Sequence, residues 1–282
     1  MEINKISVIG GGTMGNGIVH VFAMKDFDVN LIEMNEELAD KAFKTISFNL
    51  DRQIKKNTIT EDDKSNTLKR IKPITGIENT PSDSDLIIEA IYENKVAKLN
   101  IFNKLNDIVK SDSIFASNTS SISITELSMT GRPDKFIGMH FMNPVPVMKL
   151  VEIIRGYSTS DETFKQIKDL TSKLEKVPVE VHDYPGFVSN RILMPMINEA
   201  IFTLMEGVAS IESIDTVMKL GMNHPMGPLT LADFIGLDVC LAIMEVLYNG
   251  FNDPKYRPCP LLKKMVAAGK LGRKSGEGFY KY

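Results

Sequence analysis

The pattern of apolar and polar positions predicts alternating strands and helices along the first two thirds of the chain. Short apolar, often β-branched runs, typical of buried strands, occupy residues 3–9, 28–32, 86–90 and 113–116. Helical spacing follows the third of them, in the apolar stripe Ile101, Phe102, Leu105 and Ile108. Such alternation indicates an α/β fold with a Rossmann-like, doubly wound and mostly parallel sheet.

A long helical pattern from residue 36 to about residue 71 interrupts this alternation. It breaks near residues 57–60, where Thr60 and Asp63 have the spacing of a capping box. We therefore expect two helices that form a hairpin projecting from the sheet.

Basic residues are numerous on this hairpin, and three of them lie close together: Arg52, Lys55 and Lys56. Two interpretations are open. The run is a solvated helix face, which is the commoner meaning of such a pattern, or it is a contact surface for an anionic substrate that carries phosphates.

The segment 136–154 predicts two short strands joined by a rigid turn, because the sequence NPVP lies between two apolar runs. If the chain reverses there, Glu152 comes back beside His140. A carboxylate can orient a histidine ring, select its tautomer and stabilise its protonated form, as a general acid/base requires. The alternative is structural: a partly buried histidine at a strand end and a glutamate in a surface salt bridge.

The remainder of the chain changes character near Pro185. A helix over 161–174 and a strand over 177–181 complete the first pattern, and only helical periodicity follows, at 188–205, 211–220, 229–247 and 261–268. We predict an α/β domain over 1–184, with the helical hairpin at about 36–71, and an all-helical domain over 185–282. Leftover apolar surface on such helices commonly forms a homodimer.

A glycine-rich motif, GGGTMG, connects the first strand to a helix. Gly10 allows a tight turn, Gly12 lets backbone approach a pyrophosphate, and Gly15 permits close packing of helix on strand. Glu33 ends the second strand, 18 residues after Gly15, where its carboxylate can accept both ribose hydroxyls and repel a 2′-phosphate. This favours NAD over NADP. The alternative is a glycine turn with a surface glutamate.

Small polar residues, Ser117 to Ser121, follow the strand at 113–116. Ligands of open α/β sheets bind at the carboxyl ends of strands. Ser and Thr also begin helices and turns, so a capping role is the alternative.

Composition narrows the class of protein. The 282 residues carry a net charge of −3, which is unlike the basic footprint of a nucleic-acid binder. Cys240 and Cys259 lack the spacing of metal ligands or of a disulfide framework, so we expect no metal and a reducing, cytoplasmic setting. No apolar stretch approaches the roughly 18 residues of a membrane span, and none resembles a signal sequence.

Several longer motifs together resemble the short-chain 3-hydroxyacyl-CoA dehydrogenase family, and within it the bacterial 3-hydroxybutyryl-CoA dehydrogenases of butyrate metabolism. The resemblance covers essentially the whole chain and rests on VIGGGTMGNGI, IIEAIYEN, ASNTSSISITE, GMHFMNPVPVMKLVEII, PGFVSNRILMPMINEA, LGMNHPMGPLTLADFIGLD and GRKSGEGFY. It implies hydride transfer between NAD and a 3-hydroxyacyl-CoA, with a catalytic set of Ser120, His140, Glu152 and Asn190.

The resemblance also implies the binding residues. Cofactor contacts fall on Gly10, Gly12, Met14, Gly15, Glu33, Glu93, Lys98, Asn143 and Lys274. Substrate contacts fall on Ser120 and Asn190, with the coenzyme A portion at Lys56 and the hairpin around it. The (S) stereochemistry and the four-carbon acyl chain are likewise implied by the resemblance alone.

This sequence departs from the family pattern in a few places. Glu33 replaces a common aspartate, Met142 a common phenylalanine, and Asn49 a serine. Two other functions stay open from the residues: a dehydrogenase of small free 3-hydroxy acids, and a non-catalytic dinucleotide-binding protein of the same fold.

Overall fold

The computed structural model describes residues 3–282, and the chain divides into two compact units. The first unit extends to Asp183 and the second comprises Tyr184–Tyr282. Each unit has a hydrophobic core of its own. None of the helices described is long and apolar enough to cross a membrane.

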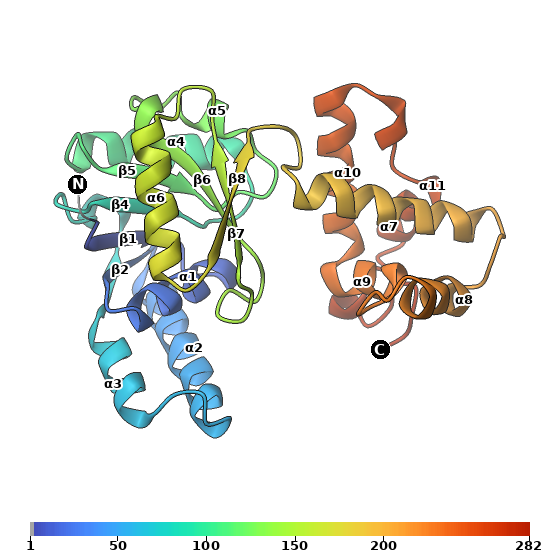
Figure 1. Ribbon diagram of the computed structural model, residues 1–282, viewed down its shortest axis with the longest axis horizontal. Helices are drawn as coiled ribbons and strands as arrows, with labels where there is room; N and C mark the ends of the chain where they lie inside the picture. Colours follow the sequence, from blue (N-terminus) through green and yellow to red (C-terminus); the bar gives the residue numbers. More distant parts are fainter. Residues whose placement is uncertain (1–2) are drawn as a thin grey trace. The chain divides into compact units, whose positions relative to one another are not determined.

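The first unit is built on a sheet that has eight strands among the residues that the structure describes (Figure 1). The strands are β1 (Lys5–Ile9), β2 (Asp28–Glu33), β3 (Ile71–Thr75), β4 (Leu86–Glu89), β5 (Ile114–Ser117), β6 (Phe136–Phe141), β7 (Leu150–Arg155) and β8 (Val177–His182). Their order is β3-β2-β1-β4-β5-β6-β7-β8. Neighbouring strands are parallel except β6 and β7, which are antiparallel. The predicted Rossmann-like, mostly parallel sheet is confirmed.

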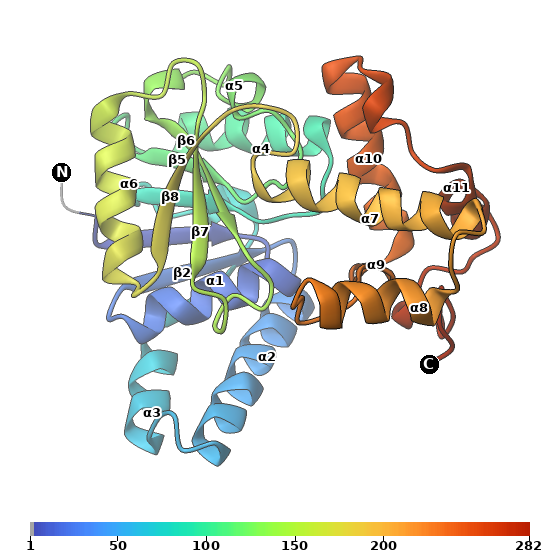
Figure 2. The ribbon, with the colours of Figure 1, turned by 45° about the vertical axis from the view of Figure 1, so that its right-hand side comes forward.

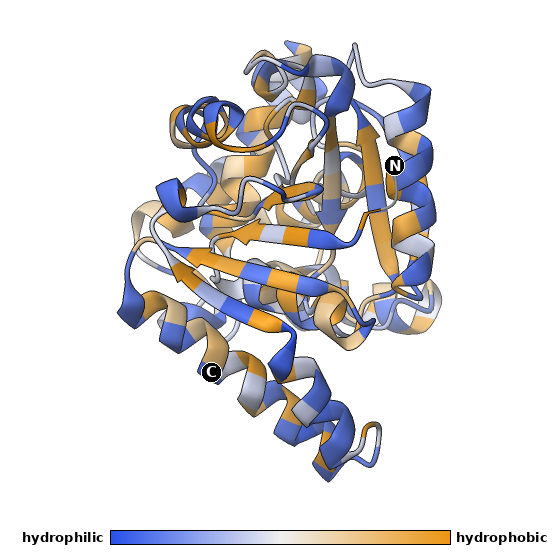
Figure 3. Cartoon of the chain, turned by 90° about the vertical axis from the view of Figure 1, so that its left-hand side faces the viewer, coloured by the Kyte–Doolittle hydropathy of each residue, from blue (hydrophilic) through white to orange (hydrophobic). Residues whose placement is uncertain are grey.

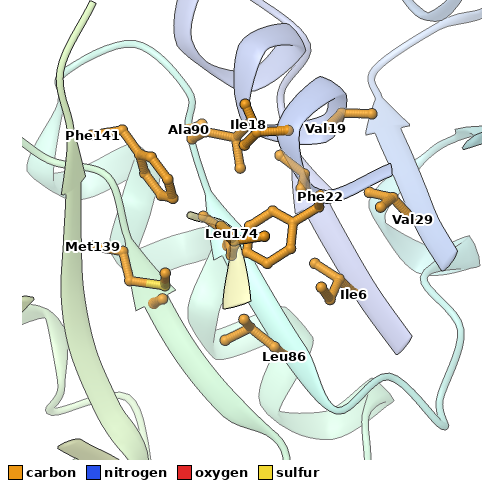
Figure 4. Packing of buried hydrophobic residues seen from close by; sticks show 14 of the residues in the cluster. Ile6, Ile18, Val19, Phe22, Val29, Leu86, Ala90, Met139, Phe141 and Leu174 are labelled. Carbon is orange, nitrogen blue, oxygen red and sulfur yellow. The ribbon is translucent and has the colours of Figure 1, made fainter. Parts of the chain in front are cut away.

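Helices cover both faces of this sheet. They are α1 (Thr13–Met24), α2 (Glu36–Lys55), α3 (Glu61–Lys69), α4 (Lys95–Ile108), α5 (Ile124–Leu127) and α6 (Asp161–Lys173), with short 3₁₀ turns at Ile77–Asn79 and Pro133–Lys135. Phe22 of α1 packs against Ile6 and Leu86 of the sheet (Figure 4). On the opposite face, Phe102 of α4 lies 4.7 Å from Phe136, ring centre to ring centre.

Burial on both faces explains the strand sequences. Every residue of β4, β5 and β6 is buried, so these strands read as continuous apolar runs with few polar interruptions. Figure 3 shows the apolar residues along the strands, while the outer helices are largely polar. The polar residues that do interrupt the buried strands are Glu89, Ser117 and His140, and they call for a reason other than packing.

The hairpin of α2 and α3 projects from the sheet as predicted (Figures 1 and 2). Its capping box is present: the Asp63 N–H donates to Thr60 Oγ1 at 3.1 Å, and the Thr60 N–H donates to Asp63 Oδ2 at 2.8 Å. The helical pattern predicted to about residue 71 agrees with α3, which ends at Lys69, but the strand that follows it, β3, was not predicted. Strand β3 pairs in parallel with β2. It contains Pro73 and is mostly exposed, as suits an edge strand, and therefore lacks a buried-strand pattern.

The second unit is helical, as predicted. Its helices are α7 (Ser189–Met205), α8 (Ile211–Thr216), α9 (Pro228–Ile235), α10 (Leu237–Phe251) and α11 (Pro260–Ala267), with a π-helical turn at Val217–Gly221 and 3₁₀ turns at Pro254–Tyr256 and Arg273–Ser275. The single helix expected over 229–247 was wrong. Gly236 adopts φ +104°, a conformation that favours glycine, and separates α9 from α10.

Two buried aspartates tie the end of the chain to this helical unit. Asp233 accepts hydrogen bonds from the N–H groups of Phe279 and Tyr280, both at 2.9 Å. Asp215 accepts from the Leu229 N–H at 2.8 Å and from the Tyr280 hydroxyl at 3.0 Å. These buried carboxylates are therefore satisfied by the segments that they join.

Candidate active site

The glycine loop between β1 and α1 has the geometry that a pyrophosphate requires. Gly10 adopts φ +93°, and a Cβ on Gly15 would lie 1.7 Å from the Gly10 carbonyl oxygen. A Cβ on Gly12 would meet nothing within 4 Å, so the space in front of the N-terminus of α1 is open at this position. Backbone N–H groups and the helix dipole favour an anion there. Met14, in the first turn of α1, packs against the core.

Glu33 lies at the end of β2, beside this loop. Its Oε1 accepts the Gly11 N–H at 2.6 Å, and its Oε2 accepts the Met34 N–H at 3.1 Å. Glu33 also lines a cavity of about 630 Å³, together with Gly10, Gly12, Met34, Leu38, Ile77 and Tyr92. A concave, largely apolar site with a carboxylate that backbone N–H groups hold in place suits the adenosine half of a dinucleotide.

A second group of polar residues lies where β4 and β5 end. Glu93 Oε1 accepts hydrogen bonds from the N–H groups of Ser120 at 3.0 Å and Ser121 at 3.1 Å, and from the Thr119 hydroxyl at 2.5 Å. Burial opposes ionisation of Glu93, but the charge of Lys98 and hydrogen bonds from the side chains of Thr119, Lys98 and Ser121 lower its pKa overall. The serine-rich loop is thus organised around one carboxylate.

Lys98 lies behind Glu93 and is only 1% exposed. Its ammonium is 2.7 and 2.9 Å from the two oxygens of Glu89 and 3.1 Å from Glu93 Oε2. Glu89 was missed by sequence reasoning because it follows three apolar strand residues. An acidic residue inside an otherwise apolar strand, nine positions before a lysine, was the available signal.

His140 and Glu152 lie directly opposite each other on β6 and β7. His140 Nδ1 is 2.8 Å from Glu152 Oε2, and the two residues are 7% and 2% exposed. The chain reversal predicted from the NPVP turn is therefore present. Because a carboxylate only accepts hydrogen bonds, Nδ1 carries the hydrogen of this pair.

Two residues fix the chain on either side of His140: Lys176, which sequence reasoning did not identify, and Asn118, which lies in the predicted polar segment Ser117 to Ser121. Lys176 donates hydrogen bonds to the carbonyl oxygens of Val145 and Met148, both at 2.7 Å. Asn118 accepts the Phe141 N–H at 3.0 Å and so connects the end of β5 to β6. A buried lysine facing two carbonyl groups has no sequence pattern that distinguishes it from a surface lysine.

The other predicted site residues lie in different surroundings. Ser120 is half-buried in the loop after β5, Asn143 is exposed in the NPVP turn, and Lys56 is exposed immediately after α2. In the second unit, Asn190 is buried in the first turn of α7, and Lys274 forms an ion pair with Asp238. Among residues 3–282, no group of three or more His, Cys, Asp or Glu is arranged to hold a metal ion.

A Rossmann-like sheet and an open glycine loop, with a buried His–Glu pair in the same unit, are typical of a dinucleotide-dependent dehydrogenase. Two family models cover the chain: the 3-hydroxyacyl-CoA dehydrogenase NAD-binding domain matches residues 5–184, and the C-terminal domain of the same family matches residues 186–282.

Individual relatives agree with these models. The probable 3-hydroxybutyryl-CoA dehydrogenase of Deinococcus radiodurans is 58% identical, over 99% of this chain and 100% of the relative. The 3-hydroxybutyryl-CoA dehydrogenase of Clostridioides difficile is 52% identical, over 99% of each. The crystal structure of (S)-3-hydroxybutyryl-CoA dehydrogenase from Ralstonia eutropha is 51% identical, with a TM-score of 0.97 over 100% of this chain and 99% of that one.

The chain belongs to the 3-hydroxyacyl-CoA dehydrogenase family and is an NAD-dependent dehydrogenase. The predicted family, enzyme class and cofactor are thereby confirmed. The described residues also fit NAD, since the open position at Gly12 and the cavity at Glu33 lie on the same edge of the sheet.

Two glycine substitutions test the geometry of the loop. Gly15→Ala places a methyl group against the Gly10 carbonyl and should lower the free energy of unfolding by about 1–3 kcal/mol. Gly12→Ala should have a free energy of unfolding within about 0.5 kcal/mol of that of the wild type. It should nevertheless bind NADH at least about tenfold more weakly, because its methyl group enters the space for the pyrophosphate. Denaturant unfolding and NADH fluorescence titration measure the two effects. Unimpaired NADH binding by Gly12→Ala would contradict this account of the loop.

Proposed function

We propose that the protein interconverts (S)-3-hydroxybutyryl-CoA and acetoacetyl-CoA, with NAD as the hydride acceptor or NADH as the donor. The acyl-CoA substrate is supported by similarity to relatives that are named 3-hydroxybutyryl-CoA dehydrogenases. The observation that carries the mechanism is the buried contact of His140 with Glu152, which supplies a base of fixed orientation inside an enzyme of this family.

His140 is the general acid/base of this proposal. With Nδ1–H directed at Glu152, Nε2 is the nitrogen that exchanges a proton with the substrate. In the oxidative direction Nε2 takes the proton of the C3 hydroxyl, and Glu152 stabilises the resulting imidazolium. In the reductive direction the imidazolium returns the proton to the oxygen of C3. NAD supplies the hydride chemistry, so the protein contributes position and electrostatics.

Ser120 and Asn190 complete the proposed catalytic set by hydrogen-bonding substrate oxygens. The support for Ser120 is its place in the loop that Glu93 organises. The role proposed for Asn190 rests on the family resemblance. Orientation matters because a near-attack geometry, with reacting atoms at roughly 3–3.5 Å, accounts for much of the rate of such reactions.

The proposed cofactor contacts fall into two groups. Gly10, Gly12, Met14, Gly15 and Glu33 border the loop and cavity already described, and Glu93 lies near the serine-rich loop. Asn143 and Lys274 rest on the resemblance. Lys98 is buried behind Glu93, so we assign it an indirect role, in which its ammonium holds the Glu93 carboxylate in place.

We further propose that Lys56 and the hairpin around it bind the coenzyme A portion, and that the first unit binds NAD while the second contributes to substrate binding and dimerisation. Exposed apolar side chains on the second unit support a homodimer, among them Leu220, Met222 and Phe234. A cytoplasmic role in butyrate metabolism completes the proposal.

Substitution of the His–Glu pair tests the mechanism. His140→Gln should lower kcat for acetoacetyl-CoA reduction at least about a hundredfold, because general acid catalysis is worth about 10²–10⁴-fold. Glu152→Gln should have a similar effect. Both variants should still bind NADH and should keep the circular dichroism spectrum of the wild type. A His140→Gln enzyme with most of its turnover intact would refute the assignment.

Reversal of one hairpin charge tests the coenzyme A site. Lys56→Glu should raise KM for acetoacetyl-CoA by about threefold or more, with a smaller change in kcat, and the effect should shrink at high salt. Lys69→Glu, at the far end of α3 from Lys56, is the matched control and should leave KM unchanged. Equal KM values for wild type and Lys56→Glu would favour a dehydrogenase of free 3-hydroxy acids.

A further inference from the structure

Three charged side chains form a cluster at the carboxyl end of β4. Lys98 contacts both oxygens of Glu89, at 2.7 and 2.9 Å, and Glu93 Oε2 at 3.1 Å. Glu89 and Lys98 are 0% and 1% exposed, whereas the Glu93 side chain is 37% exposed. The cluster therefore extends from the interior toward solvent, with Glu93 as its outermost member.

The hydrogen bonds of Glu89 are those of an ionised carboxylate. Oε1 accepts the Ile91 N–H at 2.7 Å in addition to Lys98, and Oε2 accepts the Ser117 hydroxyl at 2.6 Å in addition to Lys98. Ser117 in turn accepts the Thr119 N–H at 3.2 Å, so its own hydrogen is directed at Glu89. Burial raises the pKa of Glu89, and the charge of Lys98 is the largest effect that opposes the rise.

One ammonium between two carboxylates leaves one net negative charge. A buried lysine needs only one carboxylate for neutrality, and Glu93 already lies within contact of it. Glu89 thus supplies a charge that simple pairing does not require. Keeping a carboxylate inside a buried strand is costly, which suggests that its charge is used.

The position of the cluster indicates which part of a bound dinucleotide would be affected by its negative charge. Strand order reverses between β1 and β4, and in such sheets the two halves of a dinucleotide lie on either side of the reversal. Glu33 marks the adenosine side, at the end of β2, so the nicotinamide side is the end of β4 and β5. The nicotinamide ring is positively charged in NAD⁺ and neutral in NADH.

We propose that the cluster of Glu89, Lys98 and Glu93 favours binding of oxidised over reduced cofactor, and that Glu89 is the residue that sets its net charge. The proposal rests on the cofactor site described under Proposed function. Glu89 acts here as a positioning residue, because it is fully buried and is connected to Glu93 through Lys98. A role in packing alone would change the affinities for NAD⁺ and NADH by the same factor.

The test is the ratio of the dissociation constants of NAD⁺ and NADH, measured by calorimetry without substrate. Glu89→Gln removes the excess charge and should raise Kd(NAD⁺)/Kd(NADH) by roughly tenfold, the scale of one charge acting across several ångströms of protein. Glu126→Gln is the matched control. Glu126 forms a surface ion pair with Lys95, which lies on α4 as Lys98 does, so this variant also removes one carboxylate from a lysine of that helix. It should leave the ratio unchanged.

A double variant separates charge from packing. Glu89→Gln with Lys98→Met restores one net negative charge, on Glu93 alone, and should return the ratio toward the wild-type value. If Glu89→Gln does not fold, Glu93→Gln removes the same charge at a partly exposed position and should raise the ratio similarly.

An unchanged ratio in the folded charge-removing variant would overturn the proposal while leaving the cofactor site intact. A wild-type protein that binds neither NAD⁺ nor NADH would instead refute the cofactor site itself. The two failures are therefore distinguishable in one set of titrations.

Discussion

The antiparallel pairing of β6 with β7 is the constraint on which the proposed chemistry depends. It places His140 opposite Glu152, and a slip of one residue would turn one of the two side chains to the other face of the sheet. Lys176 fixes the loop between β6 and β7 by hydrogen bonds to two of its carbonyl oxygens. Asn118, which follows β5, accepts a hydrogen bond from the end of β6. The histidine is thus oriented by backbone geometry before any substrate arrives, as efficient proton transfer requires.

Four glutamates on or near the strands of the first unit differ in their surroundings. Glu33 is held by backbone N–H groups beside a cavity, Glu93 gathers a serine-rich loop, and Glu152 faces a histidine. Glu89 is fully buried and faces a lysine. In our proposals the same functional group therefore serves four purposes: cofactor recognition, loop positioning, support of proton transfer, and discrimination between redox states of the cofactor.

Local patterns were enough to predict much of this architecture. The GGGTMG loop after a β-branched run, the capping box at Thr60 and the NPVP turn each have a local physical cause, and each is present. Strand β3 was missed because edge strands need no apolar alternation, and one helix was divided at Gly236 because a single glycine is compatible with both outcomes. The partners of buried charges, such as Glu89 with Lys98, depend on tertiary contacts that no local pattern records.

The most direct test of the central claim compares two substrates that differ only in the thioester. Initial rates of NADH oxidation would be measured with acetoacetyl-CoA and with free acetoacetate, under identical conditions. We predict rapid oxidation with acetoacetyl-CoA and a kcat/KM at least about a hundredfold lower with acetoacetate, because the free acid lacks the binding energy of the coenzyme A portion. Equal rates, or a preference for the free acid, would contradict the assignment of this protein as a dehydrogenase of 3-hydroxyacyl-CoA substrates.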